Sequence, residues 1–317
     1  GFGLALLLGG SRYATVEVEI YQLVMFELDM AGASALVWLV LGVTAAAGLL
    51  YAWFGRRAVS DKAVSPVMPS PPQSVGEYVL LAFSVAVLSV CCLFPLSAIV
   101  VKAWSAGESR RVLMESETWQ AVWNTLRFSA AAVFAAAVLG VVYAAARRLA
   151  WMRGLVFLPF MVSPVCVSAG VLLLYPGWTA SLPLLLAMYA LLAYPFVAKD
   201  VLSAWDALPP DYGRAAAGLG ANGFQTACRI TFPLLKPALR RGLTLAAATC
   251  VGEFAATLFL SRPEWQTLTT LIYAYLGRAG EDNYARAMVL TLLLSAFAVC
   301  IFLLLDNGEG GKRTETL

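Results

Sequence analysis

The sequence predicts an all-α protein, a polytopic bundle of transmembrane helices. Hydrophobic residues make up 61% of the 317-residue chain and charged residues only 13%, whereas a soluble domain usually carries about 25% charged residues. The mean hydropathy of +0.77 agrees with this composition. Because a water-soluble core of this length could not hide so much apolar side chain, lipid must be the solvent for much of the surface.

Seven apolar runs are each long enough to cross a hydrocarbon layer as a helix, which takes about 20 residues. The runs are Ala31–Phe54, Tyr78–Val101, Ala121–Ala146, Gly154–Tyr175, Ser181–Leu202, Leu239–Leu260 and Ala285–Leu305. The shorter run Phe2–Leu8 is typical of the end of a further helix. The polar, Pro-rich stretch Ala58–Val75 is predicted to be a linker rather than a packed element.

Several classes of function are excluded by what the sequence lacks. Histidine does not occur, which excludes His-based metal sites, Ser-His-Asp triads and Cys-His dyads. The six cysteines have no metal-ligand spacing, so no metal site is predicted. The net charge of +3, without a basic stripe, is not the footprint of a nucleic-acid partner. Since no G-x-x-x-x-G-K-[ST] run is present, the chain is not expected to bind ATP through a P-loop, and no cofactor of its own is predicted.

The distribution of Lys and Arg predicts the orientation in the membrane, because cytoplasmic loops carry the excess of these residues. With the loop Trp205–Lys236 on the cytoplasmic side, fourteen of the 22 Lys and Arg residues fall inside and eight fall outside. The sequence therefore predicts a multi-pass protein with a cytoplasmic C-terminus.

The start of the chain is repeated near its end, at an offset of 252 positions. The segment Phe2–Leu41 aligns with Phe254–Leu293 without a gap. The identical pairs include Phe2/Phe254, Leu6/Leu258, Leu8/Leu260, Thr15/Thr267, Ile20/Ile272, Tyr21/Tyr273, Ala33/Ala285, Ala35/Ala287, Val37/Val289 and Leu41/Leu293. Apolar helices do match by chance, but Thr15, Ile20 and Tyr21 lie in a polar loop, where chance is a weaker explanation.

Such a repeat indicates two homologous membrane halves in one polypeptide. On this interpretation residues 1–57 are the last part of a first half, and residues 58–76 are the linker. Residues 77–306 are a second half with six transmembrane helices, and residues 307–317 are a cytoplasmic tail. Most of the first half is expected to be missing from this sequence.

The most informative polar segment is the loop Asp211–Leu235. Arg214–Leu219 is predicted to be a short helix of small residues, and Gly220 fits the position just after a helix end, where a left-handed conformation is needed. Asn222 is suited to cap a second short helix, and Pro233 is suited to the first turn of the next one. A compact loop with so many small residues can let a partner approach its backbone closely.

This loop resembles the "EAA" loop of type-1 ABC importer permeases. The family pattern reads E-A-A, three residues, G, nine residues, I, one residue, L-P. The matching positions, with every interval in agreement, are Ala215, Ala216, Gly220, Ile230 and Pro233. Two positions depart from the pattern, since Arg214 replaces the usual Glu and Phe232 replaces the usual Leu. In that family the loop forms the coupling helix, which occupies a cleft of the ATP-hydrolysing subunit, and Arg214 puts the electrostatics of this contact in doubt.

The resemblance implies a set of partners and a location. It implies a transport subunit of the cell inner membrane that is not itself an enzyme. The expected partners are a dimer of cytoplasmic ABC ATPase subunits holding ATP and Mg²⁺, a periplasmic or lipoprotein solute-binding protein, the missing first permease half and membrane lipid. Asn124-Thr125-Leu126 also resembles the start of the core permease domain.

The solute is suggested by a second resemblance. Gly252-Glu253-Phe254, followed by Leu258–Arg262, resembles the fused permeases of ferric-iron and thiamine importers, which carry two such halves in one chain. Ferric iron and thiamine are therefore the expected solutes, with sulfate, a polyamine or another small solute left open. The alternative function is an ion-gradient-driven secondary transporter. A membrane-embedded enzyme is disfavoured, because no cluster of catalytic side chains is present.

Acidic residues inside a membrane span are costly and usually functional. Glu253 lies inside the predicted span Leu239–Leu260, so Glu253 and Phe254 are the candidate residues of the translocation pathway. Alternatively, Glu253 pairs with Arg127 or with a backbone group. Tyr273 and Tyr275 either contact a binding protein or anchor their loop at the membrane interface.

Overall fold

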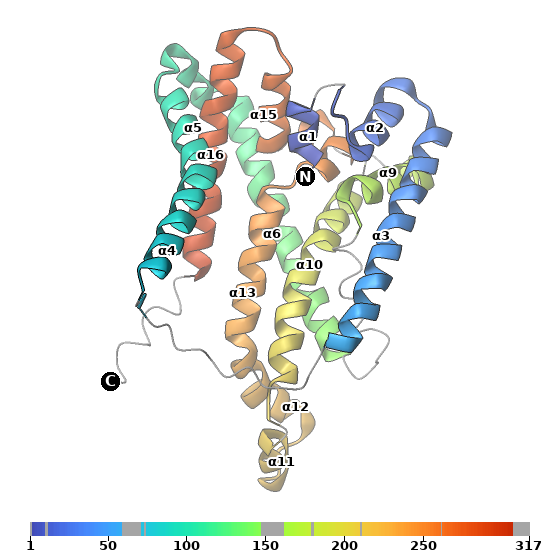
Figure 1. Cartoon of the computed structure of the whole chain (residues 1–317). Coiled ribbons are helices and arrows are strands. Elements are labelled where there is room, and N and C mark those ends of the chain that lie inside the picture. The colour runs from blue at the N-terminus through green and yellow to red at the C-terminus, as the bar shows by residue number, and fades with distance from the viewer. Residues whose placement is uncertain are drawn as a thin grey trace.

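The computed structural model describes residues 2–9, 12–58, 71–72, 74–146, 162–178, 181–209, 211–260 and 262–306. Within these ranges the chain forms helices and no strand. Figure 1 shows the long helices running roughly side by side, with a pair of short helices projecting beyond one end. The expected all-α class is thus confirmed. The predicted linker and the C-terminal tail lie largely outside the described residues.

The helices follow one another in four groups. The first group is α1 (Phe2–Leu8), α2 (Val16–Gln22), the π-helical turn η1 (Leu23–Glu27) and α3 (Met30–Ala58). The second is α4 (Val75–Leu88), the π-helical turn η2 (Ser89–Leu93), α5 (Phe94–Trp104), the 3₁₀ helix η3 (Gly107–Met114) and α6 (Ser116–Ala145). The third is α9 (Pro164–Leu174), η4 (Pro176–Trp178), α10 (Leu182–Asp206), α11 (Asp211–Gly218), α12 (Gly223–Thr226), the π-helical turn η5 (Ala227–Thr231) and α13 (Phe232–Val251). The last is α14 (Ala255–Leu260), η6 (Pro263–Trp265), α15 (Leu268–Leu276) and α16 (Glu281–Asp306).

Five described helices are long and apolar enough to cross a membrane. They are Met30–Leu50, Val75–Trp104, Ser116–Ala145, Leu182–Asp206 and Glu281–Leu305, and they coincide with five of the seven predicted runs. Of the predicted run Gly154–Tyr175, only the part from residue 162 onward is described, and it contains the short helix α9. The rest of that run lies outside the described residues.

The predicted run Leu239–Leu260 is not a single helix, which corrects the expectation of one continuous span there. Helix α13 begins earlier, at Phe232, and ends at Val251, and α14 starts at Ala255. In the break, the Ala256 amide donates to Glu253 Oε1 at 2.9 Å, and the Thr269 hydroxyl donates to the Glu253 carbonyl at 2.9 Å. A side-chain cap and a contact from another element therefore replace the helical bonds that a continuous span would make.

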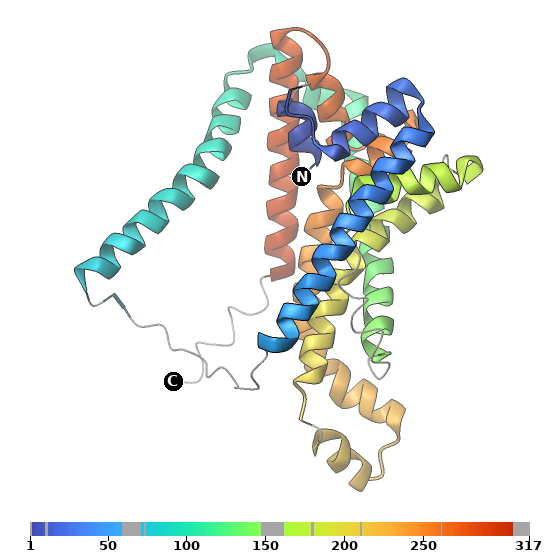
Figure 2. The same cartoon turned by 45° about the vertical axis from the view of Figure 1, so that its right-hand side comes forward.

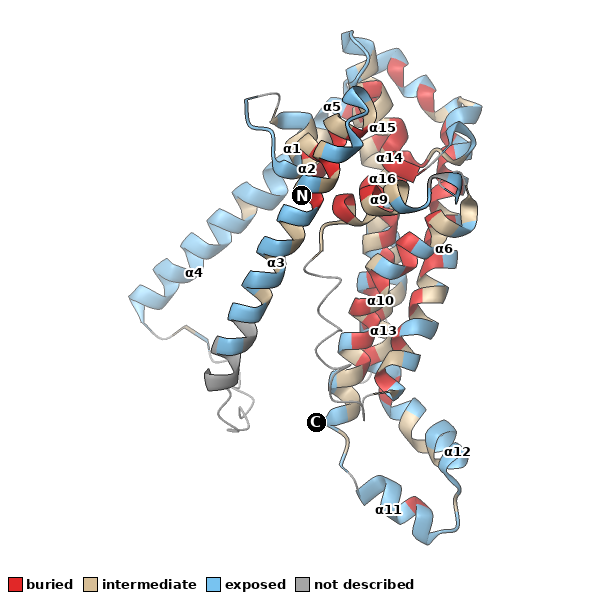
Figure 3. Ribbon diagram, turned by 90° about the vertical axis from the view of Figure 1, so that its right-hand side faces the viewer, coloured by how far each residue is buried: buried red, intermediate tan, exposed pale blue. Residues whose placement is uncertain are grey.

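Helices α6, α10 and α13 form the centre of the bundle, where Figure 3 shows buried residues along each of them. Val197 of α10 lies between two glycines of the neighbouring helices. A Cβ on Gly140 of α6 would be 2.7 Å from Val197 Cβ, and a Cβ on Gly242 of α13 would be 2.7 Å from Val197 Cα. The absence of side chains at both glycines lets the three backbones approach closely, as at many helix contacts in membranes.

Two of the π-helical turns precede a Phe-Pro pair. Turn η2 is followed by Phe94 and Pro95, and η5 is followed by Phe232 and Pro233. Proline lacks an N–H, and its ring would clash with the carbonyl four residues earlier in a regular helix. A wider π-helical turn at this point relieves the clash and keeps the helix continuous. Figure 2 shows the α4–η2–α5 segment slanting away from the bundle along most of its length.

The two segments paired by the sequence repeat have the same order of elements. With the offset of 252 positions, α1 corresponds to α14 and α3 to α16, and the first residue of α2, Val16, corresponds to the first residue of α15, Leu268. Leu28, with φ 56°, corresponds to Gly280, with φ 118°. Since a non-glycine residue rarely adopts positive φ, this agreement in backbone supports the internal repeat more strongly than residue identities alone.

Candidate functional site

The loop Asp211–Leu235, which we call the coupling loop after the family that it resembles, forms the tip of the molecule. Helices α11 and α12 project beyond the bundle at the end farthest from η3, α2 and α15 (Figure 1). We call the opposite end, with η3 and residues 262–280, the outer end.

Helix α11 ends in the local structure that the sequence predicts. Gly220 adopts φ 81°, the Ala221 amide donates to the Ala216 carbonyl at 3.0 Å, and the Gly220 amide donates to the Ala217 carbonyl at 3.0 Å. This pair of bonds is a Schellman motif, which satisfies the last carbonyls of a helix. The prediction that Gly220 follows the helix end is confirmed.

The second short helix is capped in both directions. The Gln225 amide donates to Asn222 Oδ1 at 2.8 Å, and the Asn222 amide donates to Gln225 Oε1 at 3.0 Å. This reciprocal pair is a capping box, so the predicted cap at Asn222 is confirmed. From Gly223 the chain stays helical through α12, η5 and α13, with Pro233 in the first turn of α13. The short helix is thus continuous with a bundle helix rather than separate from it.

The residues matched to the family pattern are not equally available to a partner. Arg214 and Ala215 are exposed, whereas Ala216 is buried where α11 packs on α12. Ile230 is half-buried in η5. Arg214 pairs with Asp211 of its own helix at 3.3 Å, and both side chains are exposed. The positive charge at this position is therefore partly balanced within α11.

Sequence analysis missed the large apolar side chains of the coupling loop. Leu219 is 90% exposed, Phe224 is 77% exposed and Tyr212 is 50% exposed. The signal available in the sequence was the occurrence of Tyr212, Leu219 and Phe224 among the small and polar residues 211–226. Large apolar side chains that are exposed on a projecting tip are typical of a protein-binding surface.

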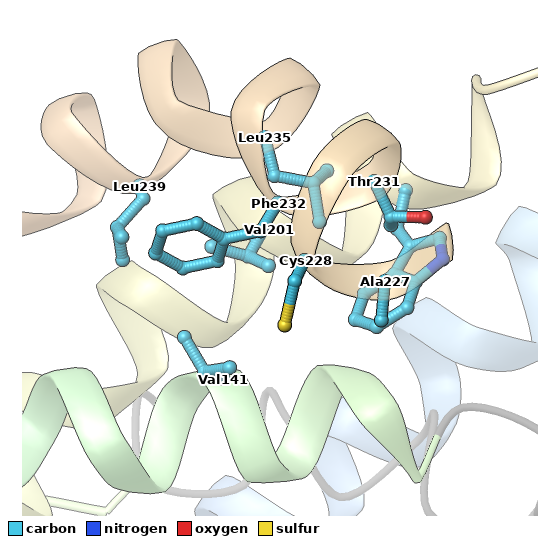
Figure 4. Close-up of a pocket in the computed structure, with 9 residues that line it drawn as sticks. Val141, Val201, Ala227, Cys228, Thr231, Phe232, Leu235 and Leu239 are labelled. Atoms are coloured by element: carbon cyan, nitrogen blue, oxygen red, sulfur yellow. The ribbon is translucent and has the colours of Figure 1, made fainter. Parts of the chain in front are cut away.

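Apolar side chains line a cavity of 190 Å³ at the junction between the coupling loop and the bundle. Figure 4 shows Phe232 and Cys228 pointing toward Val141 of α6, with Val201 of α10 beside them. Helix α13, which continues from the loop, packs on both α6 and α10, so a displacement of the loop would be passed to the bundle through these helix contacts.

Glu253 and Phe254 lie at the break between α13 and α14. The Glu253 side chain is buried and accepts a hydrogen bond from the Ala256 amide. Of the two predicted partners, Arg127 and a backbone group, the structure therefore shows the backbone group. Arg127 instead lies over the Phe128 ring, 4.7 Å from its centroid. Phe254 lines a cavity of 730 Å³ together with Gly3 and Tyr273. A pathway role for this pair stays a prediction.

The outer end is tied together by bonds between residues far apart in the sequence. Asn124 of α6 donates to the Glu264 carbonyl at 3.0 Å and to the Gln266 carbonyl at 2.8 Å. The Thr125 hydroxyl accepts the amide of Leu268 at 2.9 Å, at the start of α15. The Asn-Thr pair noted in the sequence therefore fixes the loop that follows α14.

A second polar cluster joins η3, α6, α15 and α16. The Tyr275 hydroxyl donates to Glu115 Oε2 at 3.0 Å, and burial raises the pKa of this phenol, which keeps it protonated as a donor. Arg286 pairs with Glu115 at 2.7 Å and with Asp282 at 2.8 Å, and the Ser109 hydroxyl donates to Asp282 at 2.5 Å. Tyr275 is buried, and its hydrogen bond to Glu115 helps to join α15 to the segment between η3 and α6.

Comparison with known proteins gives relatives of one kind. A family model described as the binding-protein-dependent transport system inner membrane component matches residues 130–310, more than half of the chain. The thiamine transport system permease protein of Brucella abortus is 25% identical over 319 residues, which cover 96% of this chain and 58% of that protein. This chain therefore spans less than two thirds of the length of that relative.

Two further matches have different substrates in their names. The sulfate transport system permease protein of Synechococcus elongatus is 28% identical over 256 residues, which cover 71% of this chain and 90% of that protein. A bacterial alginate ABC transporter, solved in complex with an alginate pentasaccharide-bound periplasmic protein, has a similar fold. Its TM-score is 0.60 at 15% identity, covering 73% of this chain and 92% of that chain.

Proposed function

The chain belongs to the family of binding-protein-dependent transport system inner membrane components, and on this premise we propose that it is the membrane-spanning subunit of an ATP-driven importer. In this proposal the coupling loop docks on a cytoplasmic ATPase subunit, and a periplasmic or lipoprotein binding protein delivers the solute to the outer end. The ATPase subunits hold ATP and Mg²⁺ and carry out all of the chemistry.

The coupling loop is the observation that carries the proposal. It combines a helix closed by Gly220, a capped second helix and two exposed apolar side chains, Leu219 and Phe224, on a projecting tip. A fixed shape with exposed apolar groups is what a docking element needs, because little conformational entropy is lost when it binds.

Continuity of the backbone suggests how movement would be transmitted. The helical run from Gly223 to Val251 starts in the loop and reaches the break at Gly252–Phe254 near the outer end. Helix α13 of this run packs on α6 and α10. In our proposal, closure of the ATPase subunits displaces the loop, and the run carries the displacement across the membrane to the break. The coupling loop and the C-terminus then both face the cytoplasm.

Thiamine is the solute to test first. The thiamine permease relative matches nearly the whole chain, and the expected alternatives are sulfate, named for a second relative, and ferric iron, from the sequence resemblance. The binding protein supplies part of the selectivity in this proposal, so the membrane subunit alone does not fix the solute.

The test is uptake by the full-length protein reconstituted in vesicles with its ATPase and binding protein. We expect accumulation of radiolabelled thiamine, sulfate or ferric iron that requires ATP on the loop side and is unaffected by an ionophore that dissipates ion gradients. Uptake that persists without ATP and stops with the ionophore would mean that the protein is a secondary transporter.

A further inference from the structure

A groove lies where α5, η3 and α16 meet near the outer end, around a cavity of 310 Å³. Trp104, the last residue of α5, and Arg110 of η3 line it on the side of the outer end. Helix α16 contributes a stripe of four apolar lining residues: Val289, Leu292, Leu293 and Ala296. We call this site the α5–α16 groove and its four residues of α16 the apolar stripe.

The α5–α16 groove opens away from the first repeated segment. A different set of α16 residues, which includes Tyr284, Met288 and Thr291, lines the 730 Å³ cavity together with α1. Because an α-helix has 3.6 residues per turn, these residues and the apolar stripe lie on roughly opposite sides of α16. Figure 2 shows α4 well apart from α16, so α4 does not close the groove toward the middle of the membrane. Within the described residues, the groove therefore faces the surrounding lipid.

The α5–α16 groove extends from the level of the lipid headgroups into the hydrocarbon. Trp104 is 78% exposed at the end of the span Val75–Trp104, and Trp residues at the ends of spans commonly lie at the membrane–water interface. From Val289 to Ala296 the apolar stripe runs about 10 Å along α16. One leaflet contributes roughly 15 Å to the hydrocarbon layer, so the stripe can contact most of the length that an acyl chain occupies there.

Arg110 provides a positive charge at the headgroup end of the groove. Among the described residues that line the groove, Arg110 alone is charged. Its Nε donates to the Gly107 carbonyl at 3.2 Å, and no acidic side chain in the described part of the chain pairs with it. The neighbouring Arg111 instead pairs with Glu108 at 3.2 Å. The terminal nitrogens of Arg110 are therefore available to an anion at the membrane surface.

We propose that the α5–α16 groove binds a phospholipid of the leaflet at the outer end, with its phosphate on Arg110 and an acyl chain along the apolar stripe. A guanidinium binds phosphate through several N–H groups. An apolar protein helix in the same place would cover Arg110 without pairing its charge, which is costly in a membrane. The bound lipid joins η3 to α16 across the groove. The proposal requires only that the chain lies in a membrane, so it goes beyond the import function and does not depend on it.

The experiment measures photolabelling of the full-length protein in dodecyl maltoside micelles, because this detergent carries no phosphate. The probe is phosphatidylglycerol with a diazirine in one acyl chain, and labelled peptides are identified by mass spectrometry. We expect saturable labelling of the apolar stripe. The concentration of probe for half-maximal labelling should rise about tenfold in Arg110→Gln, which removes the hydrogen bonds to a charged group, and should stay unchanged in Arg111→Gln. An equal concentration in Arg110→Gln and the native protein overturns the proposal.

Two further results separate a phospholipid site from ordinary lipid contact and from a protein contact. Diacylglycerol with the same photoreactive chain lacks the phosphate, so it should bind the native protein about tenfold more weakly than phosphatidylglycerol and should not respond to Arg110→Gln. Equal binding of the two lipids would mean that the phosphate is not recognised. Absence of label from the apolar stripe would mean that another part of the full-length protein covers the groove. Either result overturns the proposal.

The acyl-chain part of the site is tested by filling it. Ala296→Phe places a large side chain in the groove and should strongly reduce labelling of the apolar stripe by phosphatidylglycerol. The matched control is Val299→Phe, a substitution at an exposed residue of α16 that does not line the groove, and it should label as the native protein does. Equal labelling of both variants would contradict an acyl chain in the groove. This pair also keeps the test decisive if Arg110→Gln fails to fold.

Discussion

The two ends of the molecule are stabilised in different ways. In the coupling loop, the bonds that define α11, the Gly220 turn and the Asn222 cap all join residues within five positions of each other. At the outer end, Asn124 reaches partners 140 and 142 positions away, and Arg286 reaches Glu115 across 171 positions. The loop can therefore keep its shape while it moves, whereas the outer end depends on the bundle being assembled.

This contrast fits the different functions proposed for the two ends, docking on the ATPase at the loop and receiving the solute at the outer end. A part that docks on an ATPase must transmit force without losing its fold, and local bonds allow this. A part that receives a solute from a binding protein must present one arrangement, and contacts between distant residues specify such an arrangement. The matched substitutions below test the contrast, beginning with the largest expected effect.

The same substitution at the two ends should have unequal effects on stability. Asn124→Ala leaves the carbonyls of Glu264 and Gln266 without their buried donor, so we expect a loss of about 2–3 kcal/mol in the free energy of unfolding. Asn222→Ala removes an exposed cap and should cost about 1 kcal/mol or less. Thermal unfolding of the detergent-solubilised protein measures both. Equal losses would show that the ends do not differ in the way described.

A second matched pair tests backbone conformation inside the coupling loop. Gly218 and Gly220 both have open space where a Cβ would lie, but only Gly220 has positive φ. Gly220→Ala should therefore destabilise the turn by about 1–2 kcal/mol, whereas Gly218→Ala should stabilise α11 by up to about 1 kcal/mol. Hydrogen exchange at the α11 amides reports each change. Faster exchange in both variants would indicate that crowding rather than the sign of φ limits this turn.

The smallest effect is expected at Arg214. Its partner Asp211 is on the same helix, and both side chains are exposed to solvent, so Arg214→Gln should change stability by less than about 0.5 kcal/mol. If binding of the ATPase depends on charge at this position, the variant should alter the salt dependence of that binding. A clear shift in unfolding temperature would mean that Arg214 has a structural partner besides Asp211.

The sequence predicted the local features well and the distant ones poorly. Gly220, Asn222 and Pro233 could be placed because capping and proline rules depend only on near neighbours. The break after Val251 was missed because hydropathy along the chain does not register the hydrogen bond from Thr269, which lies in α15. The inward orientation of Ala216 depends on how α11 packs on α12, and a motif match carries no information about that packing.

The central claim is that the coupling loop binds the ATPase subunit, and co-purification of that subunit tests it most directly. Tagged full-length protein is isolated in a mild detergent, beside a Leu219→Asp/Phe224→Asp variant and a Met114→Asp control, which alters an equally exposed apolar side chain at the outer end. We predict that an ATPase subunit accompanies the native protein and the control, and is lost from the loop variant while that variant still inserts and unfolds normally. Retention of the ATPase by the loop variant, or its absence from the native protein in several detergents, would contradict the account.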